Sequence, residues 1–157
     1  MTLLELVVVL AIVAVSATLA APSFAQMIAN YRVRATAEGI LSALNFARTE
    51  ALRRNTPVAF SLTPGGSGWA VSELATSTTL QSRSGGDVAG TTVTPSTGAT
   101  SVTFLANGMI GSGSQLSRLV VAGTANAADA RRIDVFGGGL IRMCDPAIAT
   151  AADPRKC

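Results

Sequence analysis

The chain has 157 residues, of which 48% are hydrophobic and 13% are charged, and its formal net charge is +3. Residues 1–55 carry five arginines against three acids, and residues 56–157 carry seven cations against six acids. The positive charge is therefore not concentrated in one part of the chain, so charge alone does not indicate a nucleic-acid partner.

The chain contains no histidine and two cysteines, which excludes the usual Ser–His and Cys–His catalytic arrangements. Its carboxyl-terminal aspartates, Asp129, Asp134, Asp145 and Asp153, are too scattered to form a calcium loop. We therefore expect no enzymatic activity, no cofactor, no bound metal and no small-molecule substrate.

Residues 3–21 read LLELVVVLAIVAVSATLAA and contain a single charged side chain. As a helix this segment is about 28 Å long, which matches the hydrocarbon thickness of a bilayer. A signal peptide would place basic residues before the apolar run, and the chain opens with none. We expect the segment to be retained as a membrane anchor.

Glu5 is the one charge in this apolar segment, and placing a carboxylate there costs about 2.5–3.5 kcal/mol. Two partners could offset that cost. One is the set of unpaired amides at the start of the helix, and the other is the amino-terminal ammonium of the same or a neighbouring chain. The alternative is a carboxylate at the headgroup level of an ordinary anchor.

Pro22 interrupts the helical pattern, because proline lacks a backbone N–H and its ring clashes with the carbonyl four residues earlier. The sequence therefore predicts a kink or local melting of the helix within residues 16–22.

After Pro22 the pattern becomes amphipathic, with one apolar stripe and charged residues mostly off that stripe. The stripe consists of Ile40, Leu44, Ala47 and Ala51, widened by Leu41 and Leu52. The charged residues are Arg34, Glu38, Arg48, Glu50 and Arg54, which we interpret as pairs on the helix surface. Asn55 and Pro57 then end the helix. The prediction is one helix over residues 1–55, hydrophobic over 1–28 and amphipathic over 29–55.

Residues 56–157 are predicted to form a β-rich head. Runs of β-forming residues occur at 58–62, 69–74, 101–105, 118–123, 131–136 and 140–144. Glycine-rich segments such as 64–68 and 136–139 are interpreted as hairpin turns, since they lack the lysine and the following helix of a phosphate loop. Residues 82–100 are expected to be an exposed loop. The predicted fold class is α+β, a long amino-terminal helix packed on an antiparallel sheet or sandwich.

The two cysteines, Cys144 and Cys157, lie near the carboxyl end, and export to an oxidising compartment would favour a disulfide between them. Closing that short loop would contribute about 2–3 kcal/mol. The alternatives are two free thiols or two metal ligands. The same region holds Arg131, Arg132, Arg142, Arg155 and Lys156, which would converge if the last two strands pair and a disulfide folds the tail back. They would then form either a DNA-binding patch or ordinary solvated surface.

The first fifteen residues, MTLLELVVVLAIVAV, resemble the mature amino terminus of type IV pilins and pseudopilins: a hydrophobic first residue, a Thr-Leu step, glutamate at the fifth position and an aliphatic run. The resemblance implies that a peptidase removes a short basic leader and that the new first residue, Met1, is methylated. The family usually has phenylalanine there, so Met1 is alternatively the start codon of a shortened chain. It also implies that Glu5 neutralises the amine of a neighbouring subunit and that the helix near Pro22 is extended in assembled filaments.

Residues 46–58, FARTEALRRNTPV, resemble the helix end in the subfamily of GspH pseudopilins and FimU and FimT minor pilins. The resemblance implies a FimU-like minor subunit that is held in the inner membrane with its head in the periplasm. It would assemble with other pilins into an extracellular pilus, in its tip or priming complex. One alternative is a GspH-like pseudopilin of type II secretion.

Another alternative is a FimT-like pilin that binds DNA in natural transformation. That group carries a Gly-Arg-x-Arg element, and this chain has Gly139-Leu140-Ile141-Arg142, which lacks the first arginine. Losing one phosphate contact would weaken DNA binding, so DNA is the less favoured partner.

Overall fold

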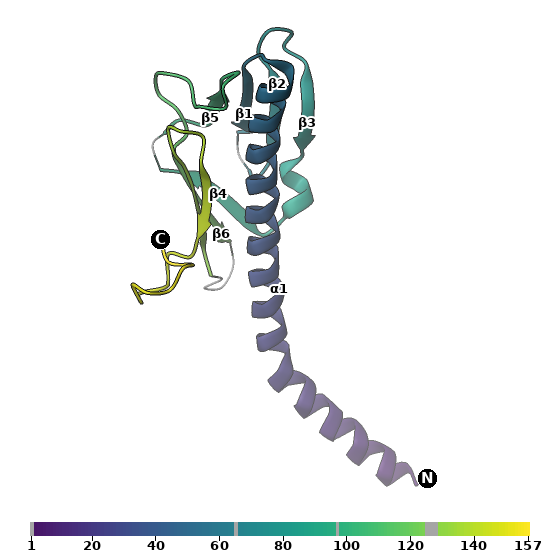
Figure 1. Cartoon of the computed structure of the whole chain (residues 1–157). Helices are drawn as coiled ribbons and strands as arrows, with labels where there is room; N and C mark the ends of the chain where they lie inside the picture. The colour runs from purple at the N-terminus through teal and green to yellow at the C-terminus, as the bar shows by residue number, and fades with distance from the viewer. Residues whose placement is uncertain (1, 65, 97, 125–128) are drawn as a thin grey trace.

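The computed structural model describes residues 2–64, 66–96, 98–124 and 129–157, without the side chains of residues 19–22 and 88. One long helix, α1 (Leu3–Arg54), runs along one side of a β-rich head and extends well beyond it at its amino-terminal end (Figure 1). The fold is therefore α+β with the helix packed on antiparallel sheets, as predicted.

The two ends of α1 are defined by local capping. Thr2 is the N-cap, and Asn55 ends the helix in the left-handed conformation, with φ of 54°. Pro57 follows, so the predicted end of the helix is confirmed. The helix is continuous through residues 16–22, without the expected local melting, although its amino-terminal part curves away from the head (Figure 1). A kink caused by Pro22 stays a prediction, because the Pro22 side chain lies outside the described part of the chain.

The carboxyl-terminal half of α1 packs on the head through the predicted stripe. Ile40, Leu44, Ala47 and Ala51 are fully buried, and Val33 and Ala37 extend the stripe toward the amino terminus. Leu41 is half-buried at its edge. Leu52 was expected to belong to the stripe but is 49% exposed, because it lies on the flank of the helix near the β5–β6 connection.

The head contains two four-stranded antiparallel sheets. The first has the order β3-β2-β1-β5, and the second has the order β4-β6-β7-β8. The strands of the first sheet are β1 (Val58–Leu62), β2 (Trp69–Glu73), β3 (Thr79–Arg83) and β5 (Ser101–Phe104). Those of the second are β4 (Thr91–Pro95), β6 (Arg118–Gly123), β7 (Arg131–Val135) and β8 (Ile141–Cys144). Both sheets contact α1, so the buried stripe of the helix joins them into one core.

The six predicted strands are present, but the prediction of an exposed loop over residues 82–100 is wrong. That range contains the end of β3, a short 3-10 helix η1 (Gly85–Val88) and all of β4. Thr91 at the start of β4 is buried, and each residue of β4 pairs with β6. Strand β4 is stabilised by this pairing and by β-branched threonines, not by an alternating apolar pattern that the sequence could have revealed.

Two of the glycine-rich segments form hairpin turns, as predicted. Between β1 and β2, the amide of Thr63 donates to the carbonyl of Gly68 at 3.0 Å. Between β7 and β8, the amide of Gly139 donates to the carbonyl of Phe136 at 2.7 Å.

Candidate functional site

The amino-terminal part of α1 has no contact with the head that covers its apolar side chains. Every described side chain from residue 2 to residue 18 is exposed, and Leu3 is 82% exposed. Phe24, Met27 and Ile28 are exposed as well. By length and composition, α1 could cross a membrane. A long, uncovered apolar surface of this kind is typical of a segment that contacts a membrane or another protein.

Glu5 closes a capping box at the start of α1. Its backbone N–H donates to the Thr2 hydroxyl at 3.3 Å, and the Thr2 N–H donates to the Glu5 carboxylate at 3.4 Å. The first of the two partners expected for Glu5, the amides at the helix start, is thus found in its own chain. Pairing with an amine of a neighbouring chain stays a prediction, and Met1 lies outside the described residues.

The helix passes from the exposed segment into the head over a single turn. Ala29 and Asn30 are half-buried, and Val33 is fully buried. The Asn30 side chain also accepts a hydrogen bond from the backbone N–H of Asp129, at 3.1 Å. The head therefore holds α1 from about residue 29 onward.

At the other end of α1, Glu50 lies at the centre of an ion cluster. The expected pairing of Glu50 with Arg54 is present, but Glu50 is only 8% exposed and so does not lie on the open surface of the helix. Its carboxylate accepts hydrogen bonds from Arg53 at 2.7 Å and from Arg54 at 2.6 Å. Hydrogen bonds from Arg53 and then Arg54 lower the pKa of Glu50 to about 2. Glu73 on β2 is the neighbouring acid, 3.7 Å from Arg54, and the Thr76 and Thr56 hydroxyls lower its pKa.

The Glu50 cluster predicts acid sensitivity of the head. Because the folded-state pKa of Glu50 is depressed from 4.5 to about 2, its stabilising contribution is present above pH 4.5 and is lost as the pH falls from about 4.5 to about 2. Thermal unfolding should be followed against pH by the fluorescence of Trp69, which is the one tryptophan and is buried beside Phe60. We expect Glu50→Gln to lower the midpoint at pH 7 and to reduce its acid dependence, whereas Arg34→Gln, which removes one exposed ion pair, should leave that dependence unchanged. Identical acid profiles for wild type and Glu50→Gln would contradict this assignment.

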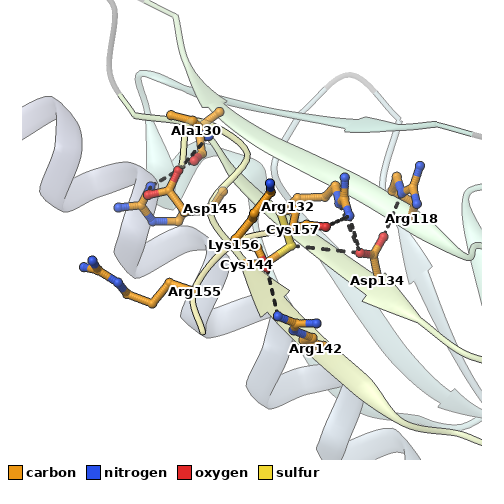
Figure 2. The surroundings of a disulfide bond; sticks show 12 residues. Arg118, Ala130, Arg132, Asp134, Arg142, Cys144, Asp145, Arg155, Lys156 and Cys157 are labelled. Carbon is orange, nitrogen blue, oxygen red and sulfur yellow. Dashed lines mark hydrogen bonds and ion pairs between the residues drawn. A yellow bond between two sulfur atoms is a disulfide. The ribbon is translucent and has the colours of Figure 1, made fainter. Parts of the chain in front are cut away.

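Cys144 and Cys157 form a disulfide, as predicted (Figure 2). Their Cα atoms are 5.0 Å apart, and Cys144 is buried at the end of β8. The disulfide brings the tail alongside β8, where Asp145 and Lys156 form a parallel bridge and the Asp145 N–H donates to the Arg155 carbonyl at 2.7 Å. The tail therefore lies against the carboxyl-terminal end of β8, which is an edge strand of the second sheet.

The five predicted basic residues gather around this disulfide, but each already has a partner. Three of them pair with aspartates: Arg131 with Asp145 at 2.6 Å, Arg132 with Asp134 at 2.9 Å, and Arg155 with Asp153 at 2.8 Å. The other two bind tail carbonyls: Arg142 those of Pro154 and Lys156, and Lys156 that of Ala149. In Figure 2, Asp134 lies between Arg132 and Arg118, which is its second partner at 2.7 Å. A role of this cluster in DNA binding stays a prediction.

The aspartates that hold these arginines were not identified as partners from the sequence. The sequence signal for these ion pairs was that Arg and Asp lie close together within residues 131–134 and 153–155. It could not reveal which charges meet, because Arg118 and Asp134 face one another only through the pairing of β6 with β7. Within the described ranges, no group of three or more His, Cys, Asp and Glu residues is placed to hold a metal ion.

Comparison with known proteins identifies the family. The family model described as "Type II transport protein GspH" matches residues 36–139, which is more than half of the chain. No curated protein matches significantly.

Two crystal structures of the type IV minor pilin FimU from Pseudomonas aeruginosa have a similar fold. One has a TM-score of 0.61 and 19% sequence identity, with 76% of this chain and 92% of that chain covered. The other has a TM-score of 0.59 and 18% identity, with 75% and 97% covered. At this identity the similarity establishes the fold, while the family model establishes membership. The chain belongs to the GspH family, the minor pilins and pseudopilins of type IV pili and type II secretion, which are structural proteins and not enzymes.

Proposed function

We propose that this protein is a FimU-like minor subunit of a type IV pilus. Before assembly, residues 1–28 would hold it in the inner membrane with the head in the periplasm. After assembly, the same residues would lie among the helices of other pilins in the filament core, with the subunit in the tip or priming complex of an extracellular pilus. The observation that carries the proposal is the apolar, exposed amino-terminal part of α1.

This segment suits both environments because its apolar side chains need a nonpolar surrounding, which lipid and a helix bundle both supply. The two environments differ in the free energy of the Glu5 carboxylate. In lipid its carboxylate costs about 2.5–3.5 kcal/mol, whereas an amine of a neighbouring subunit would neutralise it in a filament. The capping box with Thr2 lowers the cost in either environment without removing the charge.

A pseudopilin of type II secretion is the second candidate, since the matching family model is named for that system. The similarity to two FimU structures favours the pilus. DNA capture has less support, because the arginines that would contact phosphates bind aspartates and tail carbonyls. Deleting the gene and measuring pili sheared from the cells separately from secreted proteins would distinguish the pilus from the secretion system.

The Glu5→Ala variant tests the assembly mechanism. We expect the full chain to remain in the membrane fraction and its amount in sheared filaments to fall by about tenfold or more, because an amine is left buried without its partner. The measurement is an immunoblot of both fractions. Normal amounts in filaments would contradict the mechanism.

Glu5→Gln is the matched control, because glutamine retains the capping box but lacks the charge. If the charge is what assembly requires, Glu5→Gln should be as deficient as Glu5→Ala. If Glu5→Gln assembles normally, the role of Glu5 is to cap the helix.

A further inference from the structure

A pocket of about 280 Å³ lies between α1 and the segment that leads from β3 to β4. Its lining includes two arginines, Arg32 on α1 and Arg83 at the end of β3, together with Asp87 of η1. In Figure 1, η1 (teal) lies beside α1. Arg32 is exposed, so the pocket lies on a flank of the helix and not on its buried stripe.

Gly39 on α1 leaves the space that the Arg83 guanidinium occupies. A glycine in the interior of a helix is less favourable than alanine. A Cβ atom on Gly39 would lie 2.9 Å from Nη1 of Arg83, and apart from the adjacent backbone of α1 no other described atom would lie within 4 Å of it. The glycine therefore makes room for this guanidinium and not for a close contact in the core.

Arg32 and Arg83 differ from the other nine arginines of the chain. Seven of those form ion pairs with Asp or Glu, and Arg48 and Arg142 donate to backbone carbonyls. Within the described residues, the guanidinium groups of Arg32 and Arg83 have neither kind of partner, although Arg83 is half-buried. A partly desolvated guanidinium without a counter-charge is unfavourable, so the pocket lacks an anion.

The charge of the pocket suits a single carboxylate. Its lining contains two guanidinium groups and one acid, Asp87, and so has an excess of one positive charge. A carboxylate carries one negative charge, and its two oxygens match the paired N–H donors of a guanidinium.

We propose that this pocket binds an Asp or Glu carboxylate of a neighbouring subunit that is a different pilin, not a second copy of this chain. The inference rests on the proposed function, because a minor subunit in a tip or priming complex has other pilins as its neighbours. Subunits whose amino-terminal helices share one core lie side by side along those helices, so a flank of α1 is a place where neighbours meet. The inference adds a lateral contact between heads to the contact expected for Glu5 in the core.

A lipid phosphate is a less suitable occupant because of the height of the pocket. Residues 3–21 already span about 28 Å, which is the hydrocarbon core of a bilayer. Arg32 is eleven residues further, or about 16 Å, while the headgroup layer on each side is about 5–8 Å thick. The pocket therefore lies above the headgroups, where another subunit can reach it.

A zero-length crosslink tests which carboxylate enters the pocket. Lys156 is the one lysine of the chain, so Arg83→Lys adds a second lysine, in the pocket, and keeps the charge. A carbodiimide joins an amine to a carboxylate only where the two are in contact. In treated filaments, we expect mass spectrometry to find the new amine coupled to Asp or Glu of a different pilin. Arg155→Lys is the matched control and should couple only within its own chain, because Arg155 already pairs with Asp153.

Four results of this crosslink would overturn the proposal. Coupling only to Asp87 would show that the pocket is neutralised within its own chain, and coupling to a second copy would assign the wrong partner. No coupling of an incorporated Arg83→Lys chain would show that no carboxylate enters the pocket. Equal coupling of Arg83→Lys and Arg155→Lys to other pilins would show general proximity and not a site.

Gly39→Ala tests the position of the guanidinium without changing any charge. Its Cβ atom would displace the flexible end of the Arg83 side chain, and alanine suits a helix interior, so the head should stay folded. We expect Arg83→Gln and Gly39→Ala each to lower the amount in sheared filaments, relative to the membrane fraction, by about fivefold. The double variant should be no worse than Arg83→Gln alone, because both changes remove the same contact. Trp69 fluorescence checks that each variant folds.

Arg155→Gln is the control for net charge and should assemble like wild type. Equal losses for Arg83→Gln and Arg155→Gln would overturn the pocket in favour of net charge. Losses that multiply in the double variant would overturn the link between Gly39 and Arg83. Loss of Arg83→Gln from the membrane fraction would overturn the proposal in favour of lipid.

This inference and the proposed function can fail separately. If Glu5→Ala is deficient while Arg83→Gln assembles normally and Arg83→Lys does not couple, the inference fails and the proposed function stands. If wild type never enters filaments, the proposed function fails, and carbodiimide treatment of membranes decides the contact. Coupling of Arg83→Lys to another pilin there supports the contact, and its absence overturns it.

Discussion

Replacing Gly139 with alanine is expected to destabilise the head by about 2–4 kcal/mol. Gly139 has φ of +77° in the turn between β7 and β8, a conformation that side chains rarely adopt. A Cβ atom there would also collide with the carbonyl oxygen of Gly108 and lie 3.0 Å from Nε of Arg48. Arg48 donates to the same Gly108 carbonyl at 3.1 Å, so the collision would disturb a contact that joins α1 to the β5–β6 connection.

Gly138→Ala is the matched control for this prediction. It is in the same turn, but its φ is not in the left-handed region and a Cβ atom there would meet nothing within 4 Å. We expect its effect to stay within about 0.5 kcal/mol. Urea unfolding of the full chain in detergent micelles, followed by Trp69 fluorescence, measures both variants. Equal stabilities would show that the turn tolerates a side chain at Gly139.

The turn at Gly139 gives a structural reason for the glycine and the arginine of the Gly139-Leu140-Ile141-Arg142 element. Gly139 is needed for the turn, and Arg142 holds the tail through the carbonyls of Pro154 and Lys156. Both residues of the element that match the DNA-binding group therefore have a role in the fold. Their presence alone is no evidence of contact with DNA.

Removing the disulfide with the double variant Cys144→Ser, Cys157→Ser should cost about 3 kcal/mol. The two residues are 13 apart in sequence, and the chain-entropy estimate for a loop of that length gives this value. The tail would then lose its attachment to β8, and Arg142 would lose its two carbonyl partners. We expect the sheet itself to remain folded, because α1 and the other strands supply the core.

Thermal unfolding of the full chain with and without reductant measures this effect. Reductant should lower the midpoint of wild type to that of the double variant and should leave the double variant unchanged. Proteolysis should cleave the double variant first within residues 146–156. A wild-type midpoint that does not respond to complete reduction would contradict the prediction.

The sequence predicted the parts of the fold that depend on local patterns. The stripe of Ile40, Leu44, Ala47 and Ala51 and the end of α1 at Asn55 follow from helical spacing and capping. Strands β3 and β4 could not be predicted in this way. Both are rich in serine or threonine, and β4 is defined by pairing with β6, which lies almost thirty residues further along the chain.

In the candidate site, too, the residues identified from the sequence are those that a local pattern reveals. Glu5 was identified from the sequence because a charge in an apolar run is informative without its surroundings. The burial of Glu50 was missed, because its position on the helix does not show that the neighbouring β2 brings Glu73 close to it.

Helix α1 passes from exposed to buried over residues 29–33 without a break. The exposed amino-terminal segment and the head are therefore connected by continuous helix. A helix turns 100° and rises 1.5 Å with each residue. Inserting one residue into this short stretch would therefore rotate the head by about 100° about the helix axis, relative to the exposed segment, and would move it about 1.5 Å along that axis. The number of residues between Ile28 and Val33 thus sets which flank of the head each neighbouring subunit meets.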